Sequence, residues 1–392
     1  MTSGAILTLN AGSSSIKFSI YMAGDEPEER LRGEVEKIGG DNAELAIVRG
    51  DGGERRFQIG HVDHRAAMAA ILAHSGHALD GETVAGVGHR IVHGGTDFTT
   101  PTRLDDATVE RLAALEPLAP LHQPHNLAAV RAARSAFPSA VQIACFDTAF
   151  HRAHPWVNDT FALPREWYER GVRRYGFHGL SYEYVSGEVA RIAPELRHGR
   201  VVIAHLGNGA SMCAVRDGRS IASTMGFTAL DGLPMGTRCG QLDPGVLLYM
   251  MDQEKMTPPE ISKLLYHESG LKGLSGVSHD MRELEASGRP EAAEAIEYFV
   301  FRIRRELGAL SATLGGLDAL VFTGGIGEHS ALVRRKVCEN MEWLGIEIDD
   351  ERNADHALDL AVGRTRVMVV PTDEERVIAR AVNNELNAEP DR

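Results

Sequence analysis

Two short apolar strands joined by a turn of small residues open this chain, and they restrict its fold more than any other feature. Apolar side chains alternate through residues 6–9 and again through residues 16–20, which predicts two β-strands. The turn between them contains Gly12 and three serines, and Lys17 follows it. Glycine and serine let a backbone approach an anion closely and lysine adds positive charge, so the turn suits a phosphate group. Taken alone, the segment fits an ordinary hairpin with a polar turn equally well.

The same pattern returns about half a chain later. Residues 201–215 again read as strand, turn and strand, with Gly207, Asn208 and Gly209 in the turn. The repetition predicts a duplicated architecture whose phosphate-binding turns face each other. A third glycine-rich turn, at residues 324–327, follows an apolar strand and precedes an expected helix over residues 331–344. None of the turns has the P-loop spacing, but together they favour a nucleotide-binding protein.

Length and charge limit the classes of protein to consider. A chain of 392 residues exceeds the usual single core, and the pattern restarts near residue 150, so we expect domains at 1–150 and 151–371. The last helix, within 372–392, is expected to return to the first domain. The net charge of −14 argues against a nucleic-acid or anionic-membrane partner.

The termini and cysteines point to an intracellular protein. The four cysteines are scattered with no C-x-x-C pair, which is typical of reduced thiols. The first residues lack the basic region of a signal peptide, and no apolar run is long enough to span a bilayer. We therefore expect a cytoplasmic location.

Hydrophobic periodicity predicts further elements. An amphipathic helix is expected over residues 290–314, followed by a strand at 319–323. The last strand, 366–370, precedes the C-terminal helix, where Thr372 and Glu375 have capping-box spacing. That spacing gives Glu375 a structural task and leaves Glu374 for another role. Other expected helices cover residues 65–74, 105–116 and 126–136, and another expected strand covers residues 141–146.

Polar clusters occur where strands are expected to end. Ligands gather at strand ends in open α/β sheets. Arginines and histidines beside phosphate-binding turns suggest phosphoryl transfer, which needs cations to neutralise the moving group. The clusters contain Asn10, His89 and Arg90, His122, Asp147, residues 175–179, residues 205–209 and residues 235–238.

Each of these residues also has an ordinary structural explanation. Arg90 and Arg238 could be ion-pair partners, and a single histidine is more often a hydrogen-bonded structural residue than a catalyst. Asp147 could cap a helix, and a glutamate in a first helical turn can merely complement the helix dipole. The same holds for Asp280 and Arg282, which could be a helix start and an exposed charge. No Cys/His metal spacing and no G-x-S-x-G motif occurs, so zinc chemistry and a hydrolase elbow are unsupported.

Read together, the motifs resemble the acetate kinase family in order and over nearly the whole chain. The resemblance implies a mixed α/β, duplicated actin-like ATPase fold of the ribonuclease H-like kind, with two domains and a nucleotide cleft between them. It also implies reversible in-line phosphoryl transfer from ATP to acetate, with Mg²⁺, or Mn²⁺ in its place, and a homodimer. The matching stretches are residues 10–17, 88–95, 120–122, 146–151, 175–181, 205–211, 225–228, 236–238, 243–245, 276–278, 280–282, 322–328 and 371–375.

The resemblance also implies roles for individual residues. Asn10 and Glu374 would serve the metal, and Arg90 would hold the acetate carboxylate. His178 and Arg238 would stabilise the transition state, with His122 nearby. The remaining implied contacts are an acyl pocket walled by Val92, Leu121 and Phe177, and an ATP site made by Ser13, Ser15, Lys17, His205, Leu206, Gly207, Asn208, Gly209, Asp280, Met281, Arg282, Gly325, Ile326, Gly327, Glu328 and His329.

Asp147 is the proposed acid/base residue of that family. A carboxylic acid ionises near pH ~4, so acetate is already a nucleophile at neutral pH and needs no base. We therefore favour Asp147 as a residue that orients Arg90, metal-bound water or the substrate.

The chain departs from the family pattern at four positions. Leu180 and Tyr182 stand where Thr and His are common, which affects the support of His178. His329 replaces a common Asn beside the expected base contact. Ala229 replaces a common Pro in the acyl pocket, and the smaller side chain keeps a propionate or other short-chain acid kinase as an alternative. A more remote alternative is an ATP-gated module of the actin or Hsp70 kind, which has no use for a carboxylate pocket.

Overall fold

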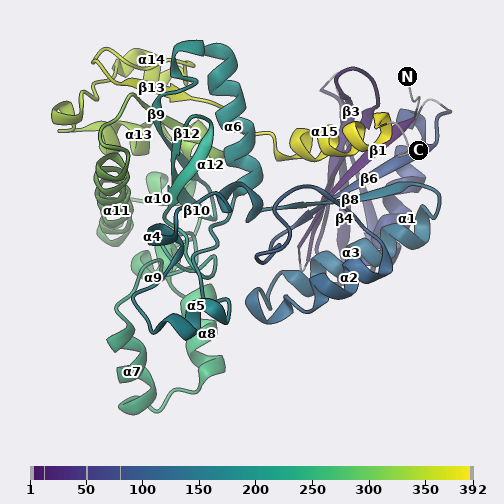
Figure 1. The fold of residues 1–392 in the computed structure, drawn as a ribbon, viewed down its shortest axis with the longest axis horizontal. Coiled ribbons are helices and arrows are strands. Elements are labelled where there is room, and N and C mark those ends of the chain that lie inside the picture. The colour runs from purple at the N-terminus through teal and green to yellow at the C-terminus, as the bar shows by residue number, and fades with distance from the viewer. Residues whose placement is uncertain (1–3, 13, 50–51, 80, 389–392) are drawn as a thin grey trace. The chain divides into compact units, whose positions relative to one another are not determined.

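The computed structural model describes residues 4–12, 14–49, 52–79 and 81–388, apart from the side chains of residues 77 and 78. Its backbone contacts divide the chain into two compact units (Figure 1). Unit 1 comprises Met1–Ala149 and Asp373–Arg392, and unit 2 comprises Phe150–Thr372. Each unit is built around one β-sheet.

The sheet of unit 1 has eight strands in the order β5-β4-β3-β2-β1-β6-β8-β7. The predicted hairpin is confirmed, because β1 and β2 pair antiparallel with Asn10 opposite Lys17. On the other side of β1, strands β6 and β8 continue the sheet in parallel. The strands are β1 (Ala5–Ala11), β2 (Ile16–Met22), β3 (Glu28–Glu36), β4 (Ala43–Arg49), β5 (Glu54–Gly60), β6 (Val84–Ile91), β7 (Thr102–Arg103) and β8 (Val141–Phe146).

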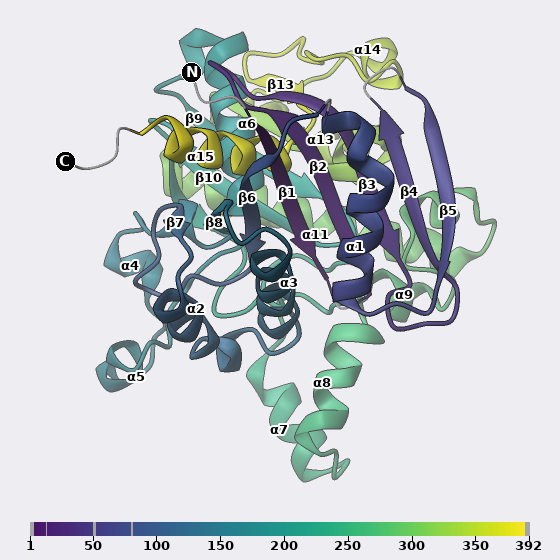
Figure 2. The ribbon, with the colours of Figure 1, turned by 90° about the vertical axis from the view of Figure 1, so that its right-hand side faces the viewer.

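Helices cover both faces of this sheet (Figure 2). Val87 of β6 packs in the apolar core that includes Ala129 and Ala133 of α3, whereas Gly86 and Gly88 face α15. A side chain at Gly88 would collide with Ile378 and Val382 of α15. Because Gly86 and Gly88 have no side chains, the C-terminal helix α15 lies directly on the backbone of β6. The helices of unit 1 are α1 (His64–Ser75), α2 (Asp106–Ala113), α3 (Gln123–Ala136) and α15 (Glu374–Asn387).

The predicted capping box at the start of α15 is wrong. Asp373 is the N-cap, and its carboxylate accepts a hydrogen bond from the backbone N–H of Arg376 at 2.9 Å. The Thr372 hydroxyl instead donates a hydrogen bond to Ser181 Oγ at 2.9 Å. Aspartate is a better N-cap than threonine, so the helix begins one residue later than the spacing suggested.

The sheet of unit 2 repeats the central topology of unit 1. Its order is β11-β10-β9-β12-β13, with β9, β10 and β11 antiparallel and β9, β12 and β13 parallel. The sequence β3-β2-β1-β6-β8 in unit 1 has the same order and the same strand directions. The predicted duplication is therefore confirmed. The strands are β9 (Arg200–Leu206), β10 (Ala210–Arg216), β11 (Arg219–Ser223), β12 (Ala319–Thr323) and β13 (Arg366–Val369).

The long helix α11 (Pro290–Leu314) has the predicted bounds, and it packs on β9, β10 and β11. Figure 1 shows it on the opposite side of these strands from α6 (Gly179–Ile192). The predicted glycine turn after β12 is itself a short helix, α12 (Gly324–His329), and the next helix, α13 (Ala331–Cys338), ends before residue 344. The other helices of unit 2 are α4 (Trp156–Asp159), α5 (Arg165–Glu169), α7 (Pro244–Asp252), α8 (Pro258–His267), α9 (Gly270–Ser275), α10 (Met281–Ala286) and α14 (Asp350–Ala354).

Among the described residues, no helix combines the length and the apolar character that a membrane crossing requires.

Candidate active site

Arg90 is the centre of the polar cluster in unit 1. It lies at the end of β6, and Asp147 follows the end of the parallel neighbour β8, so both reach the same edge of the sheet. Arg90 Nε donates to Asp147 Oδ1 at 3.0 Å, and its Nη2 donates to Oδ2 at 2.8 Å. Its Nη1 lies 3.2 Å from Oε2 of Glu374, the first residue of α15. Burial opposes the charge of Arg90, but the two carboxylates outweigh it and raise the pKa of the guanidinium.

The guanidinium keeps donor groups beyond these contacts. Two of its five N–H groups donate to Asp147, and Nη1 forms an ion pair with Glu374. Among the described residues, N–H groups of the terminal nitrogens are therefore left over. An arginine can bind both oxygens of a carboxylate through N–H groups of its two terminal nitrogens.

Asn10, Lys17, Arg90 and Glu374 belong to one face of the sheet in unit 1. Leu7, Leu9 and Ala11 of β1 point into the core on the α1 and α3 side, so Asn10 points to the side of α15. Lys17 lies opposite Asn10 and therefore shares its face. Gly88 of β6 faces α15, and Arg90, two residues further along the strand, therefore points to the same side.

Oxygen donors on this face fit a magnesium ion. An amide oxygen from Asn10 and a carboxylate from Glu374 are ligand types that Mg²⁺ accepts. Among the residues that the structure describes, no group of three or more His, Cys, Asp or Glu could form a closed metal cage. Mg²⁺ usually keeps several waters and binds substrate phosphates, so one or two protein oxygens suit it.

The expected acyl-pocket residues of unit 1 follow β6 and precede α3. Val92 is half-buried, Leu121 is 37% exposed, and His122 stands at the N-cap position of α3. The buried Asn126 was not singled out from the sequence. Its Oδ1 accepts from Val92 N at 3.0 Å and its Nδ2 donates to Ala11 O at 2.7 Å, so it ties the end of β6 to the end of β1.

Ser13 lies outside the described residues. Around it, the turn is closed by a hydrogen bond from Gly12 N to Ser15 O at 2.8 Å. Ser15 is half-buried, and Lys17 is exposed. The phosphate-binding role of this turn stays a prediction.

In unit 2, His178 and Arg238 converge on the turn between β9 and β10. A Cβ atom at Gly209 would lie 3.2 Å from His178 Nε2 and 4.0 Å from Arg238 Nη1. Arg238 Nη1 also donates to the backbone oxygen of Ala229 at 3.1 Å. The ring of His178 stacks on that of His205, with centroids 4.4 Å apart. The sequence-predicted imidazole and guanidinium are thus neighbours at a glycine turn.

A cavity of about 300 Å³ opens beside this turn. Half of the residues expected to hold ATP line it, and the lining also contains His279, Glu285 and Ser330, which were not expected. Five expected residues of unit 2 do not line the cavity. Leu206 and Gly327 are buried, and His205, Gly209 and Glu328 are half-buried. The lining consists of Gly207, Asn208, His279, Asp280, Met281, Arg282, Glu285, Gly325, Ile326, His329 and Ser330.

Asp280 is the N-cap of α10, which confirms the prediction that it could mark the start of a helix. Its carboxylate caps the helix by accepting from Arg282 N at 2.9 Å and pairs with the Arg282 guanidinium, and these hydrogen bonds lower the pKa of Asp280 to about 2. The residue still faces the cavity, so capping and ligand contact are compatible.

The short helix α12 is held in place by buried polar contacts. Glu328 Oε1 accepts from Gly324 N at 2.8 Å and from Thr372 N at 3.2 Å. Arg334, which is fully buried, donates from Nη1 to the carbonyl oxygens of Gly327 and Glu328. Sequence reasoning missed Arg334, because an arginine inside a helical pattern looks like a surface residue.

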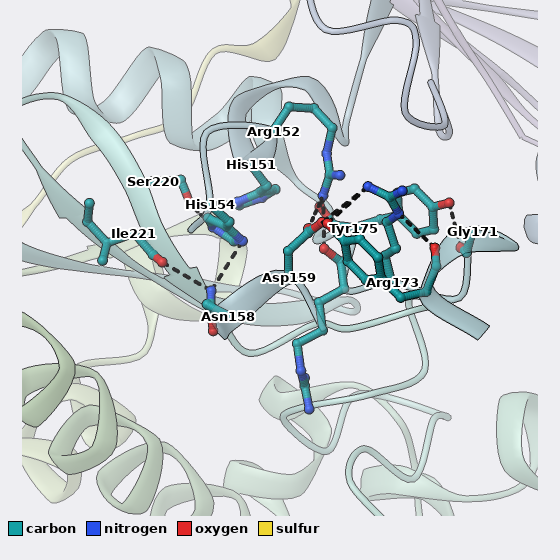
Figure 3. A network of polar contacts seen from close by, with 12 residues as sticks. His151, Arg152, His154, Asn158, Asp159, Gly171, Arg173, Tyr175, Ser220 and Ile221 are labelled. Carbon is teal, nitrogen blue, oxygen red and sulfur yellow. Dashed lines mark hydrogen bonds and ion pairs between the residues drawn. The ribbon is translucent and has the colours of Figure 1, made fainter. Parts of the chain in front are cut away.

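A second buried network holds the backbone just before His178 (Figure 3). His151 Nε2 lies 2.9 Å from the carbonyl oxygen of Phe177, and its Nδ1 lies 2.8 Å from Ser220 Oγ. His154 Nε2 lies 2.7 Å from the same hydroxyl. Burial lowers the pKa of His151 to about 4 and that of His154 to about 2, so both rings are neutral at pH 7.

The comparisons with known proteins agree with this geometry. The model of the acetokinase family matches residues 5–380. A curated acetate kinase from Methylocella silvestris is 56% identical over 394 residues, covering 96% of this chain and 97% of that protein. The chain belongs to the acetokinase family. An acetate kinase from Rhodopseudomonas palustris is 51% identical, covering 97% of this chain and 98% of that one.

Solved structures of related kinases share the fold of this acetokinase. A propionate kinase from Francisella tularensis has a TM-score of 0.92 at 35% identity, covering 97% of this chain and 99% of that one. The acetate kinase from Porphyromonas gingivalis has a TM-score of 0.88 at 36% identity, covering 98% of this chain and 100% of that one. The expected fold class, a duplicated actin-like α/β fold, is therefore confirmed.

Glu375 gives the acetokinase a pH-dependent weakness beside the Arg90 cluster. Burial, together with the neighbouring carboxylates of Glu374 and Asp373, raises the pKa of Glu375, against an opposing effect of Arg90. A raised carboxyl pKa means that the folded state prefers the protonated form. The stability that this group contributes is present at low pH and is lost as the pH rises through its folded pKa.

We predict that Glu375→Gln stabilises the protein at pH 7.5 by on the order of 1 kcal/mol and that the gain disappears near pH 4. Urea unfolding at the two pH values measures it. Glu385→Gln, on the exposed side of the same helix, is the control and should change the free energy of unfolding by less than about 0.5 kcal/mol. A gain that is equal at both pH values would contradict the explanation.

Proposed function

We propose that this protein is an acetate kinase that transfers the γ-phosphate of ATP to acetate and releases ADP and acetyl phosphate, reversibly and with Mg²⁺. The observation that carries the proposal is the meeting of His178 Nε2 and Arg238 Nη1 at Gly209, beside a cavity of nucleotide-binding size. Curated relatives that are 40–56% identical and named acetate kinase support it.

We assign the tasks as follows. Unit 1 supplies the carboxylate-binding edge of Arg90, the apolar side chains Val92 and Leu121, and the metal donors Asn10 and Glu374. Unit 2 holds the nucleotide in the cavity and supplies Phe177, His178 and Arg238. We propose these two units as the functional domains of the enzyme.

The acetate carboxylate is the nucleophile, and it is ionised at neutral pH without a base. Arg90 binds it through N–H groups of its terminal nitrogens. His178 and Arg238 donate hydrogen bonds to phosphoryl oxygens, where negative charge must be stabilised during transfer. Asn10 and Glu374 would hold Mg²⁺, which when bound neutralises the phosphate charge. Asp147 keeps Arg90 in place, and neither Asp147 nor His122 is needed as a base.

The direct test is formation of acetyl phosphate, trapped as hydroxamate. Product should depend on ATP, acetate and Mg²⁺ together, and removal of Mg²⁺ with a chelator should abolish it. Absence of product under these conditions would refute the proposal. The filament or chaperone alternative is not supported, because a kinase family matches residues 5–380 and the chain has an arginine at position 90, where we propose that the carboxylate binds.

A propionate kinase is the second candidate, because one solved relative with very similar structure bears that description and Ala229 is small. We predict that kcat/KM falls in the order acetate, propionate, butyrate, since the closer curated relatives are named acetate kinase. The expected difference per methylene is about 10-fold or more, as hydrophobic pockets discriminate by roughly 1–3 kcal/mol. Assays at several concentrations of each acid, with ATP and Mg²⁺ fixed, decide between them, and an optimum at propionate would favour the second candidate.

The two arginines should affect different kinetic constants. Arg90→Ala should raise the KM for acetate roughly 10- to 100-fold, because it removes a charge-assisted bidentate contact made in the ground state. Arg238→Ala should lower kcat roughly 100- to 1,000-fold, because its contact strengthens in the transition state. Arg380→Ala is the control: it removes an arginine of α15 that forms an ion pair with Glu26, and steady-state kinetics should not change. Wild-type constants in both site variants would refute these assignments.

We further propose a homodimer in the cytoplasm. Helix α7 has no buried residue, and Leu248, Tyr249 and Met251 on it are 63%, 55% and 42% exposed, which is typical of an interaction surface. Light scattering should give twice the 42.6 kDa of one chain, and Leu248→Glu should lower that mass. A single-chain mass for the wild type would refute the dimer.

The four cysteines form no disulfide within the chain, which supports a reducing compartment.

A further inference from the structure

Tyr182 lies one helical turn after His178 and reaches the same hydroxyl group. Its side chain is fully buried in α6, and its phenol oxygen lies 2.5 Å from Ser211 Oγ. Ser211 Oγ in turn lies 2.8 Å from His178 Nδ1. Tyr182, Ser211 and His178 therefore form a row of three hydrogen-bonding groups inside unit 2, ending at the ring that faces the phosphate turn.

The chemistry of a buried phenol sets the direction of this row. Burial raises the pKa of Tyr182 well above its ordinary value, so the hydroxyl keeps its proton. The aromatic rings around it belong to Phe150 and His151, and both nitrogens of His151 are engaged with other groups. A phenol is a good donor and a weak acceptor, so Tyr182 donates to Ser211 Oγ.

The direction of the bond from Tyr182 determines the direction of the next hydrogen bond, between Ser211 and His178. Ser211 Oγ accepts one hydrogen bond from Tyr182, and its own proton then has His178 Nδ1 as an acceptor at 2.8 Å. An Nδ1 that accepts is unprotonated, so the single proton of the neutral ring is on Nε2. That nitrogen is the one next to Gly209 in the phosphate turn.

We propose that Tyr182 is a positioning residue which, through Ser211, selects the neutral tautomer of His178 that carries its proton on Nε2. The tautomer assignment does not depend on the proposed function, but the identity of the ligand rests on it: the Nε2–H would donate to an oxygen of the transferred phosphoryl group. The opposite tautomer would present a lone pair to that oxygen and repel it. A tyrosine here thus sets the direction of the hydrogen bond as well as filling space in the helix.

The ring can be perturbed without moving the backbone. His178 has a φ of 58°, a conformation that non-glycine residues rarely adopt and that neighbouring contacts must enforce. His151 supplies such a contact by donating to the carbonyl of Phe177, the residue before it. Removing only the hydroxyl of Tyr182 leaves this contact and the phenyl ring in place.

The tautomer can be read directly with ¹⁵N-histidine-labelled, ligand-free protein. Long-range ¹H–¹⁵N spectra distinguish a protonated ring nitrogen from an unprotonated one, and a sample of His178→Asn identifies the resonances of His178. We expect an unprotonated Nδ1 and a protonated Nε2 in the wild type. In Tyr182→Phe the Ser211 hydroxyl is free to accept from the ring, and signals of the Nδ1–H tautomer should appear.

Ser211→Ala should give the same tautomer change, because it removes the link between the two rings. Tyr175→Phe is the matched control: it also deletes the hydroxyl of a buried tyrosine, one that donates to Gly171 O at 2.7 Å, and the His178 spectrum should not change. An Nδ1–H tautomer in the wild type would overturn the proposal. So would a change in Ser211→Ala without one in Tyr182→Phe, which would reduce Tyr182 to a structural residue.

Kinetics give the second readout. Tyr182→Phe should lower kcat roughly three- to tenfold, the effect of one hydrogen bond, and leave both KM values within about twofold of wild type. A merely structural role would instead lower stability and move KM and kcat together. If the wild type shows the expected tautomer but forms no acetyl phosphate, the proposed function fails while the assignment of Tyr182 stands.

Discussion

The close approach of α15 to β6 is the contact on which the cluster in unit 1 depends. Gly86 and Gly88 leave no side chain between the strand and the helix, so Ile378 and Val382 rest directly on the backbone. The helix axis is thereby set, and its first residue, Glu374, comes within 3.2 Å of Arg90 at the end of the same strand. A larger residue in the strand would lift the helix and separate the carboxylate from the guanidinium.

The two duplicated sheets carry different side chains around equivalent turns. In unit 1 the turn between the first two strands is followed by an exposed lysine, and the end of β6 carries an arginine that pairs with two carboxylates. In unit 2 the equivalent turn consists of Gly207, Asn208 and Gly209, and an imidazole and a guanidinium lie next to Gly209. The common topology places both turns at the same structural position, and the side chains around each turn determine what it binds.

The parts of this structure that the sequence predicted are those set by local patterns. The β1–β2 hairpin and α11 follow from hydrophobic periodicity, and the turn between β9 and β10 follows from residue type, whereas the third predicted glycine turn is the helix α12. The N-cap of α15 was misplaced because Thr372 and Asp373 are neighbouring residues that can both cap a helix; Asp373 is the better cap, and Thr372 bonds to Ser181 instead. Asn126 was missed because its partner, Ala11, is far away in sequence and the pattern within α3 does not indicate it. Arg334 was missed because its burial against the carbonyl oxygens of α12 depends on how α12 and α13 fold onto each other, which the pattern of α13 alone does not indicate.

Serine hydroxyls have a recurrent task in unit 2. Ser220 lies between His151 and His154, Ser211 lies between Tyr182 and His178, and Ser181 bonds to Nδ1 of His205. A hydroxyl can donate and accept at once, so the group on one side of it determines the role it plays toward the group on the other. A neutral histidine needs such a partner, because its two nitrogens must play opposite roles. A buried hydroxyl next to each ring therefore fixes the direction of these hydrogen bonds without adding a charge to the interior of unit 2.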